Sequence, residues 1–296
     1  IQEAPVAGAA PTERTEVRVL YNDEYLFIGF HCYDSEPENI VRFFMDRDFS
    51  IGNDDGTSVE LDTYNDKSTA VIFITNTLNG RFDTEVSNNG SNTNDDYNNF
   101  WDAATTVDST GYVSEYRIPF SSLRFEQKEK VVMGFRFARL IKRKNELLTY
   151  PHCDSTINNM WCNVSQAAEM EFTNLKTKKP IYITPYVIAN FEHQNNLNSD
   201  GTAYESTSTF LTRKYYSNNA TLDKIISNIG ADIKYGLTKN FTLNVTLNTD
   251  FAQAEVDNRI INLTKYEINL PEKRSFFLES QAYLNYQVGA STQLFT

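Results

Sequence analysis

Apolar and polar residues alternate along much of the chain with a period of two, which is typical of β-strands. Residues 25–33 show this most clearly, because one face of that segment collects Leu26, Ile28, Phe30 and Cys32. Alternating or β-branched segments also predict strands at 15–20, 58–63, 70–76, 80–86, 111–118 and 131–141. Short strands separated by turn residues favour an all-β fold whose first part is a jelly-roll-like β-sandwich.

A polar run interrupts this pattern between Ser87 and Phe100. Its sequence, SNNGSNTNDDYNNF, has no apolar periodicity and is rich in asparagine. We therefore expect a long exposed loop that faces a ligand.

A second set of alternating segments follows residue 180, at 181–191, 229–235 and 241–247. In the last of these, Leu243, Val245 and Leu247 alternate with polar residues. Segments of this length fit tilted strands of an outer-membrane barrel, and they fit a water-soluble antiparallel sheet equally well. No apolar run approaches the roughly 20 residues of a membrane-spanning helix, which excludes helical membrane proteins.

Composition supports sheet over helix, because aromatic residues make up 13% of the chain, with 20 Phe and 17 Tyr. The net charge of -12 argues against a nucleic-acid partner, which requires basic surfaces. Residues 1–175 carry 15 basic and 28 acidic side chains, whereas residues 176–296 carry 12 and 11. This step in charge predicts a domain boundary, giving a sandwich over 1–175 and a second region over 176–296.

Several long motifs resemble a family of bacterial outer-membrane proteins. They include PTERTEVRVLYNDEYLFIGFHCYDSEP from Pro11, DRDFSIGNDDGTSVELDTYND from Asp46, and EYRIPFSSLRF from Glu115. They also include GFRFARLIKRKNE, IKYGLTKNFTLNVTLNTDFAQAEVD and NLTKYEINLPEKRSFFLES further along the chain. That family joins a domain similar to carbohydrate-binding module family 9 to a β-barrel region of unknown function. The resemblance implies a sandwich followed by the opening strands of a barrel in the bacterial outer membrane, in contact with its lipid.

Carboxylates cluster between residues 46 and 66, and hard oxygen ligands in a flexible loop suit Ca²⁺. The candidate ligands for this cofactor are a subset of Asp46, Asp48, Asp54 and Asp55. The spacing is not that of an EF-hand, and a solvated acidic loop is the alternative. Modules of the resembling family often hold structural calcium, which favours the ion.

Sugar recognition requires flat aromatic faces with amide, carboxylate or guanidinium groups nearby. Candidate contact residues for a glycan are Trp161, Trp101, Tyr64, Asn98 and Asn99. For Trp101 the alternative is a side chain that plugs the end of the sandwich, and for Trp161 it is one that covers a sheet edge.

Three cysteines give an odd count. Cys153 and Cys162 are separated by eight residues in a polar segment and are candidates for a disulfide. Cys32 lies in an apolar strand, where a buried thiol is expected.

No signature of a hydrolase, metalloprotease or nucleotide-binding enzyme occurs in the sequence. We therefore expect a non-catalytic outer-membrane protein whose sandwich recognises a glycan, or docks a partner protein, over a barrel. The main alternative is a structural subunit of an outer-membrane transport or secretion complex without a sugar site. A glycan hydrolase is the third hypothesis, because any acidic β-domain offers pairs of carboxylates.

Overall fold

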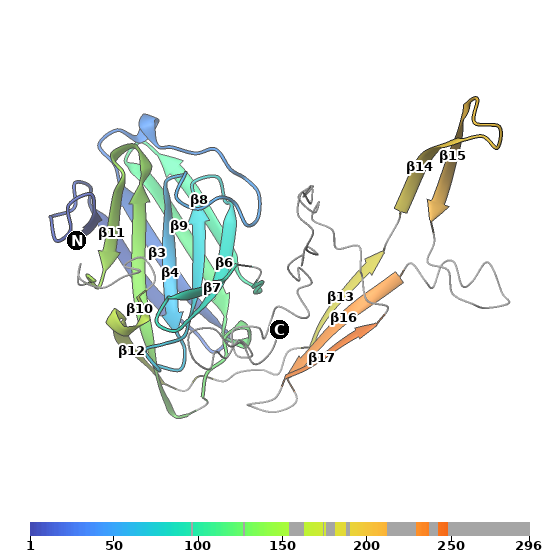
Figure 1. Cartoon of the computed structure of the whole chain (residues 1–296). Helices are drawn as coiled ribbons and strands as arrows, with labels where there is room; N and C mark the ends of the chain where they lie inside the picture. The colour runs from blue at the N-terminus through green and yellow to red at the C-terminus, as the bar shows by residue number, and fades with distance from the viewer. Residues whose placement is uncertain are drawn as a thin grey trace, which may run out of the picture. The chain divides into compact units, whose positions relative to one another are not determined.

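The computed structural model describes residues 1–95, 97–126, 128–153, 163–173, 175, 181–187, 190–211, 229–236 and 242–247 (Figure 1). These residues fall in two compact units, one up to residue 175 and one from Ile181 onwards. Within them the only regular elements are strands and short 3-10 turns, so the predicted all-β fold is confirmed. None of the described helical turns has the length and hydropathy that would let it cross a membrane.

The first unit contains two antiparallel sheets that lie face to face (Figure 1). The smaller sheet has the order β2-β3-β9-β8, formed by Thr15–Tyr21, Tyr25–Tyr33, Gly111–Pro119 and Asp102–Asp108. The larger sheet has the order β1-β11-β10-β4-β5-β6-β7, and β12 also pairs with β10. Its strands are Gln2–Ala4, Glu146–Tyr150, Lys130–Ile141, Gly56–Asp62, Ala70–Asn76, Arg81–Ser87, Asn92–Asn94 and Ala168–Thr173. Short 3-10 turns occur at Pro37–Asn39, Phe120–Ser122, Lys142–Lys144 and Val164–Gln166.

The core lies between the inner faces of the two sheets. Leu26, Ile28 and Phe30 of β3 are almost fully buried against the larger sheet. Leu61 of β4 and Phe135 of β10 contribute to the same cluster. Each such side chain stabilises the fold by roughly 1.5–3 kcal/mol through burial. The predicted period of two therefore corresponds to real inward and outward faces.

A buried guanidinium links the two sheets at one end of this core. Arg139 of β10 is 1% exposed and donates hydrogen bonds to the carbonyl oxygens of Arg14 (3.1 Å) and Tyr33 (2.9 Å). It also donates to Thr15 Oγ1 (3.0 Å) and lies 3.6 Å from Asp34 Oδ2. The larger sheet is thereby fixed to β2 and to the end of β3.

A buried phenol makes a second link between the sheets. The hydroxyl of Tyr116, on β9, donates to the carbonyl oxygen of Thr57 on β4 (2.6 Å). It also accepts the N–H of Thr75 on β5 (3.2 Å). Together with Arg139, this contact sets the register of one sheet over the other.

The structure corrects two details of the predicted strands. Residues 87–100 are not one exposed loop, because Asn92–Asn94 form β7 at the edge of the larger sheet and Tyr97 is buried. Strands β1, β7, β8, β11 and β12 of the first unit have no counterpart among the predicted segments. Strands β1 and β7 have only three residues, and β8 has Val107 as its only large apolar residue.

The second unit contains two small antiparallel sheets among its described residues. Ile181–Val187, Ile229–Gly236 and Thr242–Leu247 form the sheet β13-β16-β17, and Asn190–Leu197 pairs with Tyr204–Leu211 as β14-β15. The resembling segment NLTKYEINLPEKRSFFLES lies outside the described residues. The expectation of a barrel stays a prediction.

One face of the sheet β13-β16-β17 is apolar. In successive cross-strand rows it carries Ile181, Tyr235 and Leu243; then Ile183, Ile233 and Val245; then Pro185, Ala231 and Leu247. Ile183 is 63% exposed and Leu247 is 53% exposed. The opposite face carries the polar groups of Thr184, Asp232 and Thr246. Large apolar side chains of this sheet therefore face outwards.

We predict that Arg139→Met lowers the free energy of unfolding of the first unit by about 3–5 kcal/mol. The substitution keeps most of the side-chain volume. It removes the guanidinium donor from the carbonyl oxygens of Arg14 and Tyr33. It also takes one of two cations away from Asp34, which keeps Arg143. Urea unfolding followed by tryptophan fluorescence measures the change. Arg18→Met is the matched control, because the Arg18 side chain is 83% exposed. Equal stabilities of the two variants would contradict the role assigned to Arg139.

Candidate functional site

Two opposite charges face each other on the outer surface of the larger sheet. Glu60 of β4 and Arg136 of β10 are cross-strand partners, 3% and 2% exposed. Both point away from the core, because their neighbours Leu61 and Phe135 point into it. Glu3 of β1 completes this group, with its Oε1 3.6 Å from Arg136 Nη2. We call these three residues the Glu60 cluster.

The Glu60 cluster is short of hydrogen bonds. Among the described residues, no hydrogen-bond partner is found for the two carboxylate oxygens of Glu60 or the three guanidinium nitrogens of Arg136, and all five atoms are buried. Asp62, the next outward carboxylate of β4, instead accepts the N–H groups of Asp66 (3.1 Å) and Lys67 (2.9 Å). Buried polar atoms normally find partners, and perturbed groups of this kind gather at functional sites.

Burial raises the pKa of the Glu60 carboxyl to about 7, although the neighbouring Arg136 charge lowers it. Glu60 therefore changes its protonation state near neutral pH. In its protonated form it donates a hydrogen bond, and in its ionised form it accepts them. A ligand that carries hydroxyl groups satisfies both forms, because each hydroxyl donates and accepts.

Two ends of the chain segment that contains Trp161 lie against this face. The N–H of Cys153 donates to Glu3 Oε1 (2.7 Å). Eleven residues later, Val164 packs on Ile72, the β5 residue opposite Glu60. Trp161 and Cys162 themselves lie outside the described residues, so the predicted glycan contact and the predicted disulfide stay predictions.

Three of the predicted glycan contacts line a different hollow, of about 470 Å³. Asn98, Asn99 and Trp101 meet there, beside Arg47. Asn98 Oδ1 accepts from Arg47 (2.9–3.0 Å), and the amide of Asn99 donates to Tyr97 Oη and the Ser122 carbonyl oxygen (3.0 Å each). The side-chain amides of Asn98 and Asn99 are therefore already hydrogen-bonded within the protein.

The Trp101 ring belongs to the core more than to this hollow. Its side chain is 3% exposed and stacks on Tyr116, with ring centroids 5.7 Å apart and planes at 8°. Tyr64, the fifth predicted contact, is 49% exposed beyond the end of β4 and does not line this hollow.

The four candidate calcium ligands are not gathered together. Among the described residues, no three His, Cys, Asp or Glu side chains meet where a metal ion would bind. Asp54 is buried and accepts the N–H groups of Phe43 and Phe44 (3.0 Å each) and the amide of Asn76 (2.8 Å).

The other three carboxylates have separate surroundings. Asp55 is also buried and accepts the N–H of Lys142 (2.7 Å), and burial raises its pKa to about 6. Asp46 and Asp48 are exposed on the preceding turn. The calcium expectation rests on the resemblance alone.

Sequence reasoning did not single out Glu60 and Arg136. A signal was present, because both charges interrupt strands that are otherwise apolar, in VELD and GFRFAR. Such charges read equally well as solvent-facing residues of a half-exposed sheet. Only the pairing of β4 with β10 shows that they oppose each other and are buried.

We predict that protonation of Glu60 stabilises the fold. Its pKa rises from 4.5 in the unfolded chain to about 7 in the folded one, so its stabilising effect is full below pH 4.5 and is lost as the pH rises through 7. The wild type should lose about 3 kcal/mol over that range relative to Glu60→Gln, which stays neutral. Urea unfolding at several pH values measures the difference, and parallel pH profiles for the two proteins would disprove it.

Comparison with known proteins adds the family. A search of the curated proteins finds no match. Two solved structures of a carbohydrate binding module family 9 from Caldicellulosiruptor kristjanssonii are similar at 18% identity. The complex with cellotriose covers 55% of this chain and 76% of that chain, with a TM-score of 0.39. The complex with glucose covers 58% and 81%, with a TM-score of 0.40. A structure from Bacteroides uniformis covers 54% and 78% at 8% identity, with a TM-score of 0.45.

Two family matches account for most of the chain. Residues 206–286 match a domain of unknown function, DUF5916. Residues 3–174, more than half of the chain, match the family described as carbohydrate family 9 binding domain-like. The chain therefore belongs to the carbohydrate family 9 binding domain-like family.

Proposed function

We propose that the first unit binds a glycan without chemically changing it, and that the Glu60 cluster is the centre of its binding site. Family membership supports the ligand class. The observation that carries the choice of site is the set of five buried polar atoms of Glu60 and Arg136, which have no hydrogen-bond partner in the described part of the chain.

A sugar supplies what this cluster lacks. Vicinal hydroxyls of a pyranose match the forked donors of a guanidinium and the two oxygens of a carboxylate. Each hydrogen bond to a charged group contributes about 1.5–3 kcal/mol. Glu60 and Arg136 are buried, so the groups that bury them must move before a glycan can enter. We therefore expect the glycan to associate slowly.

Binding without catalysis fits the state of the neighbouring carboxylates. A glycosidase requires two carboxyl groups with different tasks on either side of the scissile bond. Here Asp62 accepts two backbone N–H groups, and Glu3 accepts from Thr149 and Cys153. Of these three carboxylates, Glu60 is the one whose two oxygens both lack a hydrogen-bond partner among the described residues.

We propose that Trp161 supplies the aromatic platform of this site. It stands two residues before Asn163, and Asn163 and the adjacent Val164 are fully buried, with Val164 on the same face of the larger sheet.

The test is a glycan array probed with the full-length chain, followed by titration with the best binder under tryptophan fluorescence. We expect Trp161→Phe and Glu60→Gln each to weaken binding by about 10- to 100-fold, and Trp161→Phe to remove the fluorescence response. Trp101→Phe is the matched control, because the chain has only two tryptophans and Trp101 lies in the core. It should keep both binding and response.

Two results would overturn this assignment. Unchanged affinity in both Trp161→Phe and Glu60→Gln would remove the Glu60 cluster from the binding site. Absence of any bound glycan, together with a stoichiometric protein that co-purifies with the chain, would favour a docking subunit of an outer-membrane assembly.

We further propose that the second unit contacts the lipid of the bacterial outer membrane through the apolar face of β13-β16-β17. The support is the separation of faces, in which Ile183 and Val245 share a row of apolar side chains while Thr184 and Asp232 lie on the other side. Strands that contact lipid alternate in this manner, with polar residues on the inner side.

Charge placed on the two faces should have different effects. We expect Ile183→Lys to lower the stability of the chain folded in lipid vesicles by about 2–4 kcal/mol, because it moves an ammonium group into hydrocarbon. Thr184→Lys, the neighbouring residue on the polar face, should cost less than half as much. Urea unfolding from vesicles measures both. Equal losses, or a wild-type chain that stays in the aqueous phase, would contradict lipid contact.

A further inference from the structure

Gly29 occupies the middle of β3, an inner strand of the smaller sheet, without a local reason for glycine. A Cβ built at this position meets nothing within 4 Å, and the backbone is not in the left-handed region. Gly111, by contrast, has a φ of +138° and lies against the Cys32 carbonyl oxygen. Glycine inside a strand costs about 0.5–1 kcal/mol relative to alanine. Such a residue often marks a place where a ligand approaches the sheet.

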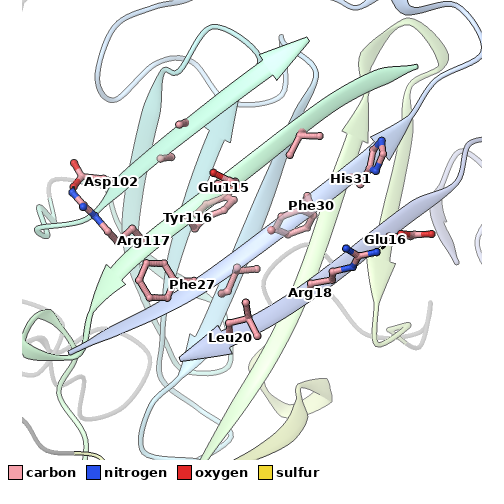
Figure 2. Close-up of a pocket in the computed structure, with 15 residues that line it drawn as sticks. Glu16, Arg18, Leu20, Phe27, Phe30, His31, Asp102, Glu115, Tyr116 and Arg117 are labelled. Carbon is pink, nitrogen blue, oxygen red and sulfur yellow. Dashed lines mark hydrogen bonds and ion pairs between the residues drawn. The ribbon is translucent and has the colours of Figure 1, made fainter. Parts of the chain in front are cut away.

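The missing side chain opens a hollow of about 680 Å³ on the solvent face of this sheet (Figure 2). Along β3, the ring of Phe27 lies on one side of Gly29 and that of His31 on the other. Phe27 and His31 are four residues apart, and a rise of about 3.3 Å per residue places their positions about 13 Å apart along the strand. The His31 ring is fixed by stacking on Tyr33, with centroids 4.0 Å apart and planes at 23°.

Charged groups flank the hollow across the strands. The row through Gly29 has Arg18 on β2 and Glu115 on β9. The next row has the ion pair of Arg117 with Asp102 (2.5 Å), which Figure 2 shows at one end of the hollow. The carboxylate of Glu115 makes no hydrogen bond or ion pair with any described residue. A carboxylate and guanidinium groups thus border an open floor.

The balance of charge selects the class of ligand. Two arginines and three carboxylates line the hollow, namely Arg18, Arg117, Glu16, Glu115 and Asp102. Opposite charges alternate around it, so a polyanion or a strongly basic peptide meets repulsion on one side for each attraction on the other. A neutral ligand with many hydroxyls matches donors and acceptors alike, and its apolar ring face suits Phe27.

We infer that the hollow over Gly29 is a second carbohydrate site, which takes a neutral pyranose on the face of the sandwich opposite to the Glu60 cluster. A volume of about 680 Å³ lies within the range of small-molecule sites. Asp102 and Arg117 also line the adjoining hollow beside Phe100, which is 49% exposed. The neighbouring ring of an oligosaccharide therefore has a place next to the first. This inference goes beyond the proposed function, and it stands on different residues.

Gly29→Val separates binding from folding. Valine is favoured in strands, so the melting temperature should stay the same or rise, while the added side chain fills the floor of the hollow. The probe is the neutral oligosaccharide that binds most tightly to the full-length chain on a glycan array, titrated by calorimetry. We expect the stoichiometry to fall from two sites to one. Thr106→Val, on the same face but outside the hollow, is the matched control and should keep both sites.

The three patterns of loss distinguish the two sites. If Glu60→Gln keeps one binding site, and adding Gly29→Val removes that site, both assignments hold. If Gly29→Val binds like the wild type, this second site is disproved and the Glu60 cluster stands or falls on its own variants. If Gly29→Val removes all binding and Trp161→Phe removes none, the hollow is the only site. If the wild type binds no neutral glycan, the inference is overturned.

Discussion

The guanidinium of Arg139 is the constraint on which the arrangement of the first unit depends. It comes from the larger sheet, and its acceptors include backbone oxygens at the start of β2 and the end of β3 in the smaller sheet. Apolar packing alone tolerates one sheet sliding over the other, because it has no direction. A buried charge with several acceptors has one favourable position. The outer faces of both sheets, where the two proposed glycan sites lie, inherit their geometry from that position.

The two sites use the sheet differently. At the Glu60 cluster, the charged groups of Glu60 and Arg136 lack hydrogen-bond partners among the described residues, so a ligand would complete an existing polar network. At Gly29 a side chain is absent, so a ligand would fill a shape. The first arrangement depends on the protonation state of Glu60 and therefore on pH. The second depends on the aromatic surface of the Phe27 and His31 rings.

Sequence periodicity predicted the strands with strong alternation, such as Tyr25–Tyr33 and Ala70–Asn76, with their observed bounds. It missed β8, in which Val107 is the only large apolar residue, and β12, which pairs with the distant strand β10. The same limit applies to function. Asn98 and Asn99 are close to Trp101 in sequence and do share a hollow, whereas Glu60 and Arg136 meet only through the register of β4 with β10. Local patterns carry no information on such a register.

The position of β10 has a consequence for how the chain is made. This strand pairs with β4, β11 and β12, so the larger sheet is incomplete until residues 130–173 have been synthesised. In the smaller sheet, β3 likewise waits for β9, since Gly29 pairs with Glu115. Contacts so distant along the chain close slowly. A nascent chain that ends near residue 125 therefore presents β4 with one edge unpaired, and chaperones have their clearest target at that stage.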